Sequence, residues 1–63
     1  VPTIIVEAFH RLPARQRLAC SLFYLLDLST TEVAEVMGIS EGATAAHLHR
    51  ARETLRPMLE DQR

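Results

Sequence analysis

The side chains best suited to chemistry gather in the last third of this 63-residue chain. Arg50 and Arg52 follow His47 and His49 closely, and an arginine can contact a phosphate or pair with the edge of a guanine base. The two histidines lie about 200° apart around a helix, so they do not share a metal ion. The spacing therefore argues against a metal site. Arginines on an exposed helix face are more often solvated or paired with a neighbour such as Glu53, so residue type alone leaves an anionic partner open.

Catalysis finds no support in the sequence. No nucleophile stands beside a base, no glycine-rich phosphate loop is present, and no pair of carboxylates is suitably spaced. Cys20 has no second cysteine to pair with, and its position predicts a small buried core residue. Ser29 and Ser40 are explained as helix caps. We expect no enzyme activity, no cofactor, no metal site and no small-molecule substrate.

Length and composition indicate one small folded domain. The chain is 48% hydrophobic and 24% charged with 2 Gly and 3 Pro, which argues against disorder. Its net charge of -1 does not by itself indicate nucleic acid. No apolar run approaches the ~20 residues that cross a bilayer, and a lone cysteine favours a reducing compartment. Because residues 1–63 begin without an initiator Met, we expect a C-terminal fragment of a longer protein.

Two helices are expected in the first half of the chain. A helical stripe predicts the first, from Thr3 to about Arg11. The second is expected from Pro13 to about Leu26, since proline suits the first turn of a helix. The stripe of the first helix consists of Ile4, Ile5, Ala8, Phe9 and Leu12.

Two more helices are expected in the second half. Ser29 and Glu32 have the spacing of a capping box, and Gly38 suits the left-handed turn after a helix that ends at Met37. Two residues later, Ser40 can cap a last helix. Its stripe consists of Thr44, Leu48, Ala51, Leu55 and Leu59.

The last helix is expected from Glu41 to about Leu59, with Pro57 kinking it or ending it near Leu55. No strand alternation or hairpin signal occurs, so the fold class is all-α. A short capped helix, a turn with glycine and a longer capped helix form a helix-turn-helix. That pattern alone leaves DNA binding and a plain helical bundle equally open. The expected core residues are Phe9, Leu18, Leu22, Val33, Val36, Ile39, Leu48 and Leu55.

Five segments of the chain form a distinctive pattern: Leu12-Pro13-Ala14-Arg15-Gln16-Arg17, Leu28-Ser29, Glu32-Val33-Ala34, Met37-Gly38-Ile39-Ser40-Glu41-Gly42 and Leu48-His49-Arg50-Ala51-Arg52. In these segments the chain resembles region 4 of bacterial sigma factors, and most closely the extracytoplasmic-function group, over about residues 5 to 59. LuxR-type domains share the Gly38-to-Gly42 turn and a pair like His47-Leu48, but seldom the other motifs.

The resemblance implies promoter recognition in a bacterial cytoplasm, with the last helix in the major groove at the upstream (-35) promoter element. It also implies that another face binds the flap of the RNA polymerase β subunit, or an anti-sigma factor. Mapped onto this chain, the positions facing DNA are Arg50, His49, Ala46, Ala45, His47 and Arg52. The positions facing phosphates are Thr30, Thr31, Ser40 and Glu41, mainly through backbone N–H groups.

The last helix departs from the pattern of its relatives. They commonly have Thr-Val-Lys-Ser-Arg where this chain has residues 43–47, so Ala45 and His47 replace two usual cations and Thr44 replaces a core valine. Each lost phosphate contact weakens DNA binding and flattens its salt dependence by about one unit of slope. Base recognition would then depend on Arg50 and on apolar contacts of Ala45 or Ala46 with thymine methyl groups. The sequence predicts a weak or altered DNA reader.

The end of the second helix is more apolar than one helix can bury, so part of it should stay exposed for a partner. A protein-interaction domain that docks a regulator or self-associates is therefore the alternative function. A LuxR-type output domain that binds DNA as a dimer is a further alternative. The predicted partner-binding residues are Phe23, Tyr24, Leu25, Leu26 and Leu28.

Overall fold

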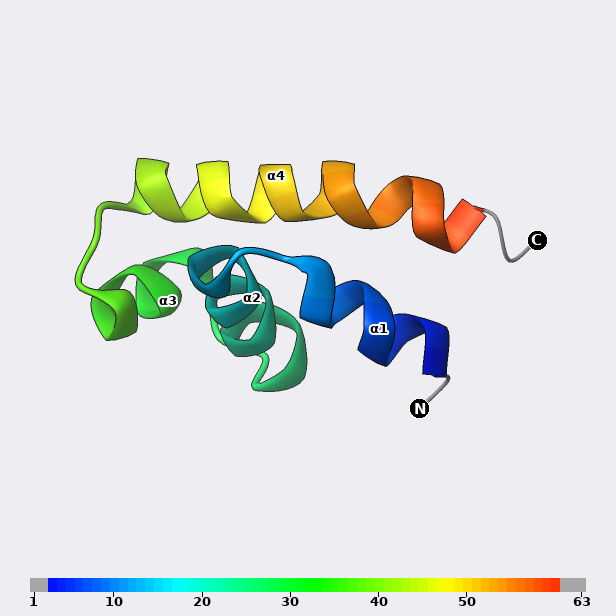
Figure 1. Cartoon of the computed structure of the whole chain (residues 1–63). Helices are drawn as coiled ribbons and strands as arrows, with labels where there is room; N and C mark the ends of the chain where they lie inside the picture. Colours follow the sequence, from blue (N-terminus) through cyan, green and yellow to red (C-terminus); the bar gives the residue numbers. More distant parts are fainter. Residues whose placement is uncertain (1–2, 61–63) are drawn as a thin grey trace.

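The computed structural model describes the backbone of residues 3–60 and the side chains of residues 6–57, and this part of the chain is helical. Its helices are α1 (Thr3–Arg11), α2 (Ala14–Cys20), α3 (Thr30–Met37) and α4 (Glu41–Glu60). A π-helical turn, η1 (Ser21–Leu25), follows α2. The long α4 runs along one side of the molecule, with α3 beside its start and α2 and α1 beside the rest (Figure 1). The predicted all-α helix-turn-helix domain is confirmed.

The first two helices meet at a turn that an arginine holds. Pro13 lies just before α2 rather than in its first turn, and its carbonyl accepts the Arg17 N–H at 2.9 Å. The half-buried Arg17 side chain also donates from Nη2 to the Leu12 carbonyl at 3.2 Å. Arg17 therefore fastens the end of α1 to α2, a role that its sequence position did not indicate.

The second helix does not continue as an α-helix to Leu26, contrary to the prediction. In η1 the Leu26 N–H bonds to the carbonyl of Ser21, five residues back, at 3.2 Å. Leu22 is buried there, whereas Leu18, one turn earlier, is exposed and was wrongly assigned to the core.

Asp27, just after η1, has a left-handed backbone with φ of 56°. This conformation is strained for a side chain with a Cβ and free of strain for glycine. We expect Asp27→Gly to raise the free energy of unfolding by about 0.5–1 kcal/mol, after the greater entropy of glycine in the unfolded chain is deducted. Urea titration followed by circular dichroism measures the change. A loss of stability would mean that the Asp27 side chain supports the turn.

The helix-turn-helix is capped as the sequence predicts. The Ser29 hydroxyl accepts the Glu32 N–H at 3.1 Å, and the Glu32 carboxylate accepts the Ser29 N–H at 2.9 Å. Both bonds lower the pKa of Glu32, and the bond from the Ser29 backbone N–H has the larger effect. Gly38 ends α3 with φ of 68°, and the Ser40 hydroxyl accepts the Ala43 N–H at 3.0 Å at the start of α4. The turn between the helices is thus set by local bonds.

The long helix α4 runs from Glu41 to Glu60, which agrees with the predicted end at about Leu59. Pro57 does not end it near Leu55, because α4 continues to Glu60. Pro57 lies in the last turn of this 20-residue helix. Because proline has no backbone N–H, the helix loses only one hydrogen bond there. Earlier in α4, Thr44 is fully buried, and its hydroxyl donates to the Ser40 carbonyl at 3.0 Å. The predicted core position of Thr44 is confirmed.

The core lies between α4 and the other helices. Phe9, Phe23, Leu28, Met37 and Leu55 pack partly buried around its edge. The fully enclosed cluster consists of Leu12, Ala19, Cys20, Leu22, Val33, Leu48 and Ala51.

Val36 was expected in the core but is 61% exposed. The buried side of α3 is formed by Val33, Ala34 and Met37, and Val36 points well away from that side. Ile39 is only half-buried. The predicted stripe positions Ile4, Ile5 and Leu59 lie outside the residues whose side chains are described.

Candidate nucleic-acid interface

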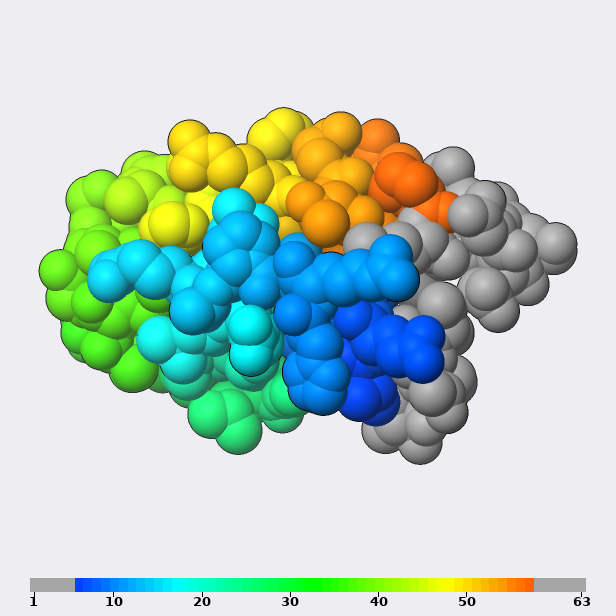
Figure 2. All heavy atoms as spheres, in the orientation of Figure 1, coloured from blue at the N-terminus to red at the C-terminus, as the bar shows by residue number. Residues whose placement is uncertain are grey.

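The exposed face of α4 is the candidate DNA-reading surface. His49 and Ala45 lie one turn apart near its middle, and both are exposed. Arg50 and Arg52 are two residues apart, about 200° around the helix, so they leave α4 at opposite edges of this face. In the space-filling view the side chains of α4, yellow to orange, remain at the surface along the helix (Figure 2). The helix therefore presents a small central surface between two cations.

The other predicted DNA positions of α4 are less open. Ala46 and His47 are half-buried, and the Nδ1 atom of His47 is shielded from solvent with no hydrogen-bond partner among the described residues. Thr44 and Leu48 beside them belong to the core. The surface that a DNA groove could reach is thus centred on His49 rather than on His47.

The N-terminal ends of the two helices are joined by a side-chain bond. The Thr31 hydroxyl on α3 donates to the Glu41 carboxylate on α4. Both residues are exposed, as is Ser40, whereas Thr30 is half-buried. The structure therefore brings the four predicted phosphate-facing residues to one end of the helix-turn-helix. The first N–H groups of a helix are available to an anion in this position.

Charge on α4 is nearly balanced. Glu53 pairs with Arg56 at 3.4 Å between carboxylate and guanidinium, and both side chains are exposed, so this pair contributes little to stability. Arg50 has no hydrogen bond or ion pair within the described side chains. Its side chain is exposed and can therefore meet a ligand.

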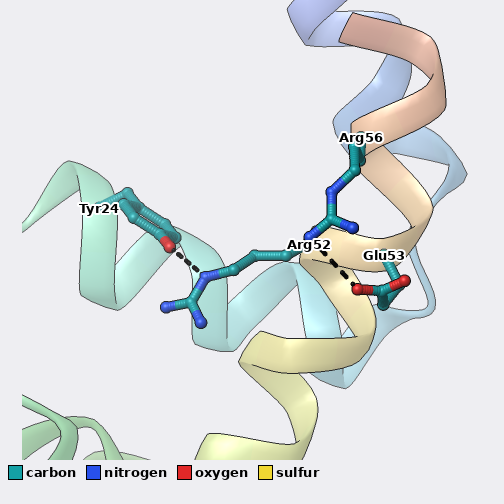
Figure 3. A network of polar contacts seen from close by, with 4 residues as sticks. All are labelled: Tyr24, Arg52, Glu53 and Arg56. Atoms are coloured by element: carbon teal, nitrogen blue, oxygen red, sulfur yellow. Dashed lines mark hydrogen bonds and ion pairs between the residues drawn. The ribbon is translucent and has the colours of Figure 1, made fainter. Parts of the chain in front are cut away.

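Arg52 has an intramolecular partner that sequence reasoning did not foresee. Its Nε donates to the Tyr24 hydroxyl at 2.8 Å, and its guanidinium carbon lies 5.9 Å from the centroid of that ring (Figure 3). The positive charge also acts on Cys20: burial raises the pKa of the Cys20 thiol, and Arg52 opposes this rise. No local sequence signal relates two residues that lie 28 positions apart.

The predicted partner-binding residues form an exposed apolar surface on and after η1. Leu25 is 73% exposed, Leu26 is 64% exposed, and Tyr24 is also exposed. Phe23 and Leu28 are half-buried and pack against the core. Since α3 packs against η1, the exposed Val36 adds apolar surface on the neighbouring helix. Three of the five predicted residues are therefore available to a partner.

Metal and membrane sites are not found in the described part. No group of three His, Cys, Asp or Glu side chains there is placed to hold a metal ion. Cys20 is buried and unpaired, as predicted. Among the described helices, none combines the length and the apolar character that a membrane span requires.

Comparison with known proteins identifies a relationship over most of the chain. A family model described as sigma-70, region 4, matches residues 3–55. The chain is also similar to the ECF RNA polymerase sigma factor SigW of Bacillus subtilis (strain 168), with 37% identity over 57 residues. The aligned segment covers 90% of this chain and 30% of that relative. The chain thus spans less than a third of the length of the curated relative that it matches.

Proposed function

Because the chain belongs to the sigma-70 region 4 family, we propose that it recognises the -35 promoter element and binds the RNA polymerase β flap during transcription initiation. The observation that carries this proposal is the exposed face of α4, with His49 at its centre and Arg50 free at one edge. A major groove about 12 Å wide admits a helix in this way. The core on the opposite side of α4 holds the helix rigid.

The side chains of α4 suggest how the bases are read. Arg50 can form a bidentate pair with guanine, and such a pair discriminates against the wrong base by about 1–3 kcal/mol. His49 can donate to a base edge, and the methyl group of Ala45 can contact a thymine methyl. Two residues with readable polar groups make a short recognition surface, which fits a module that needs a second attachment.

The second attachment is the apolar surface of η1. The proposed polymerase contact includes the exposed Leu25 and Leu26, with Phe23 and Leu28 beneath them. Binding to polymerase raises the effective concentration of the domain at the promoter, so weak DNA affinity suffices. An anti-sigma factor that covers the same residues would block this attachment.

The same exposed residues favour a second candidate function. A domain that only binds proteins would use Leu25 and Leu26, and its α4 would make no contact with DNA. The family model that matches residues 3–55 is that of sigma-70, region 4, whose members act in transcription, and this favours the first candidate.

Transcription by a chimera tests the proposal. The region of SigW that aligns with this chain is replaced by the chain, and transcription by core RNA polymerase is measured on promoters with a randomised -35 element. We expect a preferred sequence class, and a loss of that preference by about 5- to 150-fold in Arg50→Ala. Arg56→Ala, on the same helix, is the matched control and should keep the preference.

The second candidate predicts a different pattern in this assay. Arg50→Ala would then change nothing, while Leu26→Ser would abolish complex formation. Under the main proposal Leu26→Ser lowers transcription from every promoter equally, because it weakens the contact with polymerase and leaves base recognition intact. Equal output from all -35 sequences with the unmodified chain would contradict promoter recognition.

A further inference from the structure

Tyr24 and Arg52 form a supported pair between η1 and α4. The Tyr24 hydroxyl accepts the Arg52 Nε–H at 2.8 Å, and the guanidinium lies within the range of a cation–π contact with the ring. The Tyr24 ring meets Phe23 edge-on, with 4.9 Å between centroids and 82° between planes. Phe23 in turn packs on the core. The guanidinium of Arg52 is therefore held by a chain of contacts that begins in the core.

Most of the hydrogen-bond donors of Arg52 and Tyr24 remain available to a ligand. An arginine has five N–H donors, and the bond from Nε uses one. Within residues 6–57 Arg52 has no other hydrogen bond and no ion pair, and the neighbouring Glu53 pairs with Arg56. Figure 3 shows the two terminal nitrogens of Arg52 beyond the contact with Tyr24. The Tyr24 oxygen accepts in this contact, so its own O–H remains free to donate.

The pair also lies on the same side of α4 as the start of α3. Glu41 and Arg52 are eleven residues apart, about three helical turns, and so project from one side of the helix about 16 Å apart. Thr31 of α3 bonds to Glu41, and Tyr24 of η1 bonds to Arg52. One edge of the α4 face thus carries the predicted phosphate-facing end of α3 and, further along, Arg52, which has no ion pair with any side chain of residues 6–57.

We propose that Tyr24 and Arg52 form a clamp for a backbone phosphate of duplex DNA at the margin of the groove that α4 enters. Arg52 makes the contact, and Tyr24 is a positioning residue that holds the guanidinium in place. This inference rests on the proposed function, since it requires α4 to bind DNA. It moves Tyr24 from the predicted protein-binding surface to the DNA side and leaves Leu25 and Leu26 for the protein partner.

The chemistry of the pair fits a phosphate better than a base. A phosphate accepts two parallel N–H bonds from one guanidinium, and a side chain already immobilised by Tyr24 loses less entropy on binding. Arg50 leaves α4 at the opposite edge, so the two arginines reach different sides of the helix. The clamp would supply part of the cationic contact that Ala45 and His47 no longer provide.

The test uses a duplex of random sequence, so that base recognition does not contribute. Binding is measured by fluorescence anisotropy over a range of salt concentrations for Arg52→Ala, Tyr24→Phe and the double variant. We expect Arg52→Ala to lower affinity about 3- to 10-fold and to reduce the slope of log affinity against log salt by about 0.9. Tyr24→Phe keeps the ring and the charge, so it should lower affinity about 2- to 4-fold with an unchanged slope.

The double variant and two controls complete the experiment. If Tyr24 acts through Arg52, the double variant binds as Arg52→Ala does. Arg11→Ala removes a charge from the end of α1 and should leave the slope unchanged, and Arg52→Lys should restore it. Circular dichroism confirms that each variant is folded. A Tyr24→Phe effect that persists in full when Arg52 is absent would overturn the positioning role.

The outcomes separate this inference from the proposed function. If Arg52→Ala leaves the slope unchanged while Arg50→Ala weakens binding, the clamp is wrong and DNA binding stands. The Tyr24 contact is then only a support between η1 and α4. If the unmodified chain shows no salt-dependent binding, the clamp and the DNA-binding function fail together.

Discussion

Leu48→Ala is expected to remove most of the stability of this domain. Leu48 is 3% exposed in the cluster where α4 meets the other helices. Truncation of a buried leucine to alanine costs about 2–5 kcal/mol, because the removed methyl groups lose their burial and a cavity remains. A chain of 63 residues has a total stability of roughly 3–9 kcal/mol at typical values per residue. A single truncation at Leu48 therefore brings the domain close to its unfolding midpoint.

The matched control for this prediction is Leu25→Ala. It makes the same chemical change at a side chain that is 73% exposed. Exposed positions change stability by less than about 0.5 kcal/mol, so Leu25→Ala should unfold at nearly the wild-type urea concentration. The free energy of unfolding of both variants is measured by urea titration at about 25 °C. Equal shifts in the two variants would contradict the assignment of the core.

Restoring the two cations that relatives carry is expected to strengthen DNA binding. Ala45 is exposed and His47 is half-buried beside the reading face, so Ala45→Lys with His47→Arg places two charges near the groove. Each added phosphate contact steepens the salt dependence by about 0.9 in log affinity. Between about 50 and about 200 mM salt, the double variant should lose about tenfold more affinity than the wild type loses. At the lower salt concentration it should bind at least several-fold more tightly.

The same substitutions at a remote site provide the control. Ala14→Lys with His10→Arg adds identical charges on α2 and α1, at exposed positions away from the start of α4. Anisotropy titrations with a labelled duplex should give this variant the wild-type salt slope. If both double variants gain affinity equally, net charge and not the α4 face controls binding.

Local signals in the sequence predicted the helix-turn-helix well. The reciprocal bonds of Ser29 and Glu32, the left-handed Gly38 and the Ser40 cap each depend on residues within a few positions of one another. Such features are specified by neighbouring residues and need no tertiary information. The same holds for Thr44, which lies on the buried stripe of α4.

Features that depend on distant contacts were not predicted. Leu18 fits a helical stripe with Leu22, but α2 buries Ala19 and Cys20 instead, so Leu18 is exposed. Val36 fits an apolar pattern too, but α3 has only one buried side, formed around Val33.

The candidate site shows the same division. Arg50 and His49 were assigned through the resemblance to sigma region 4, and both are exposed on α4. The bond between Tyr24 and Arg52 joins two elements that meet only in the folded chain, so the spacing of apolar residues in the sequence does not indicate it. Its signal in the sequence is limited to a lone tyrosine among the exposed apolar residues of η1.

We propose that the exposed face of α4 reads DNA through Arg50. A selection from random duplexes at low salt, run in parallel on the wild-type chain and on Arg50→Ala, tests it most directly. We expect the wild type to enrich a short motif, and Arg50→Ala to lose the preference at one or two positions while it still binds DNA. Enrichment of the same motif by both chains, or no enrichment by either chain when tethered to RNA polymerase, would contradict it.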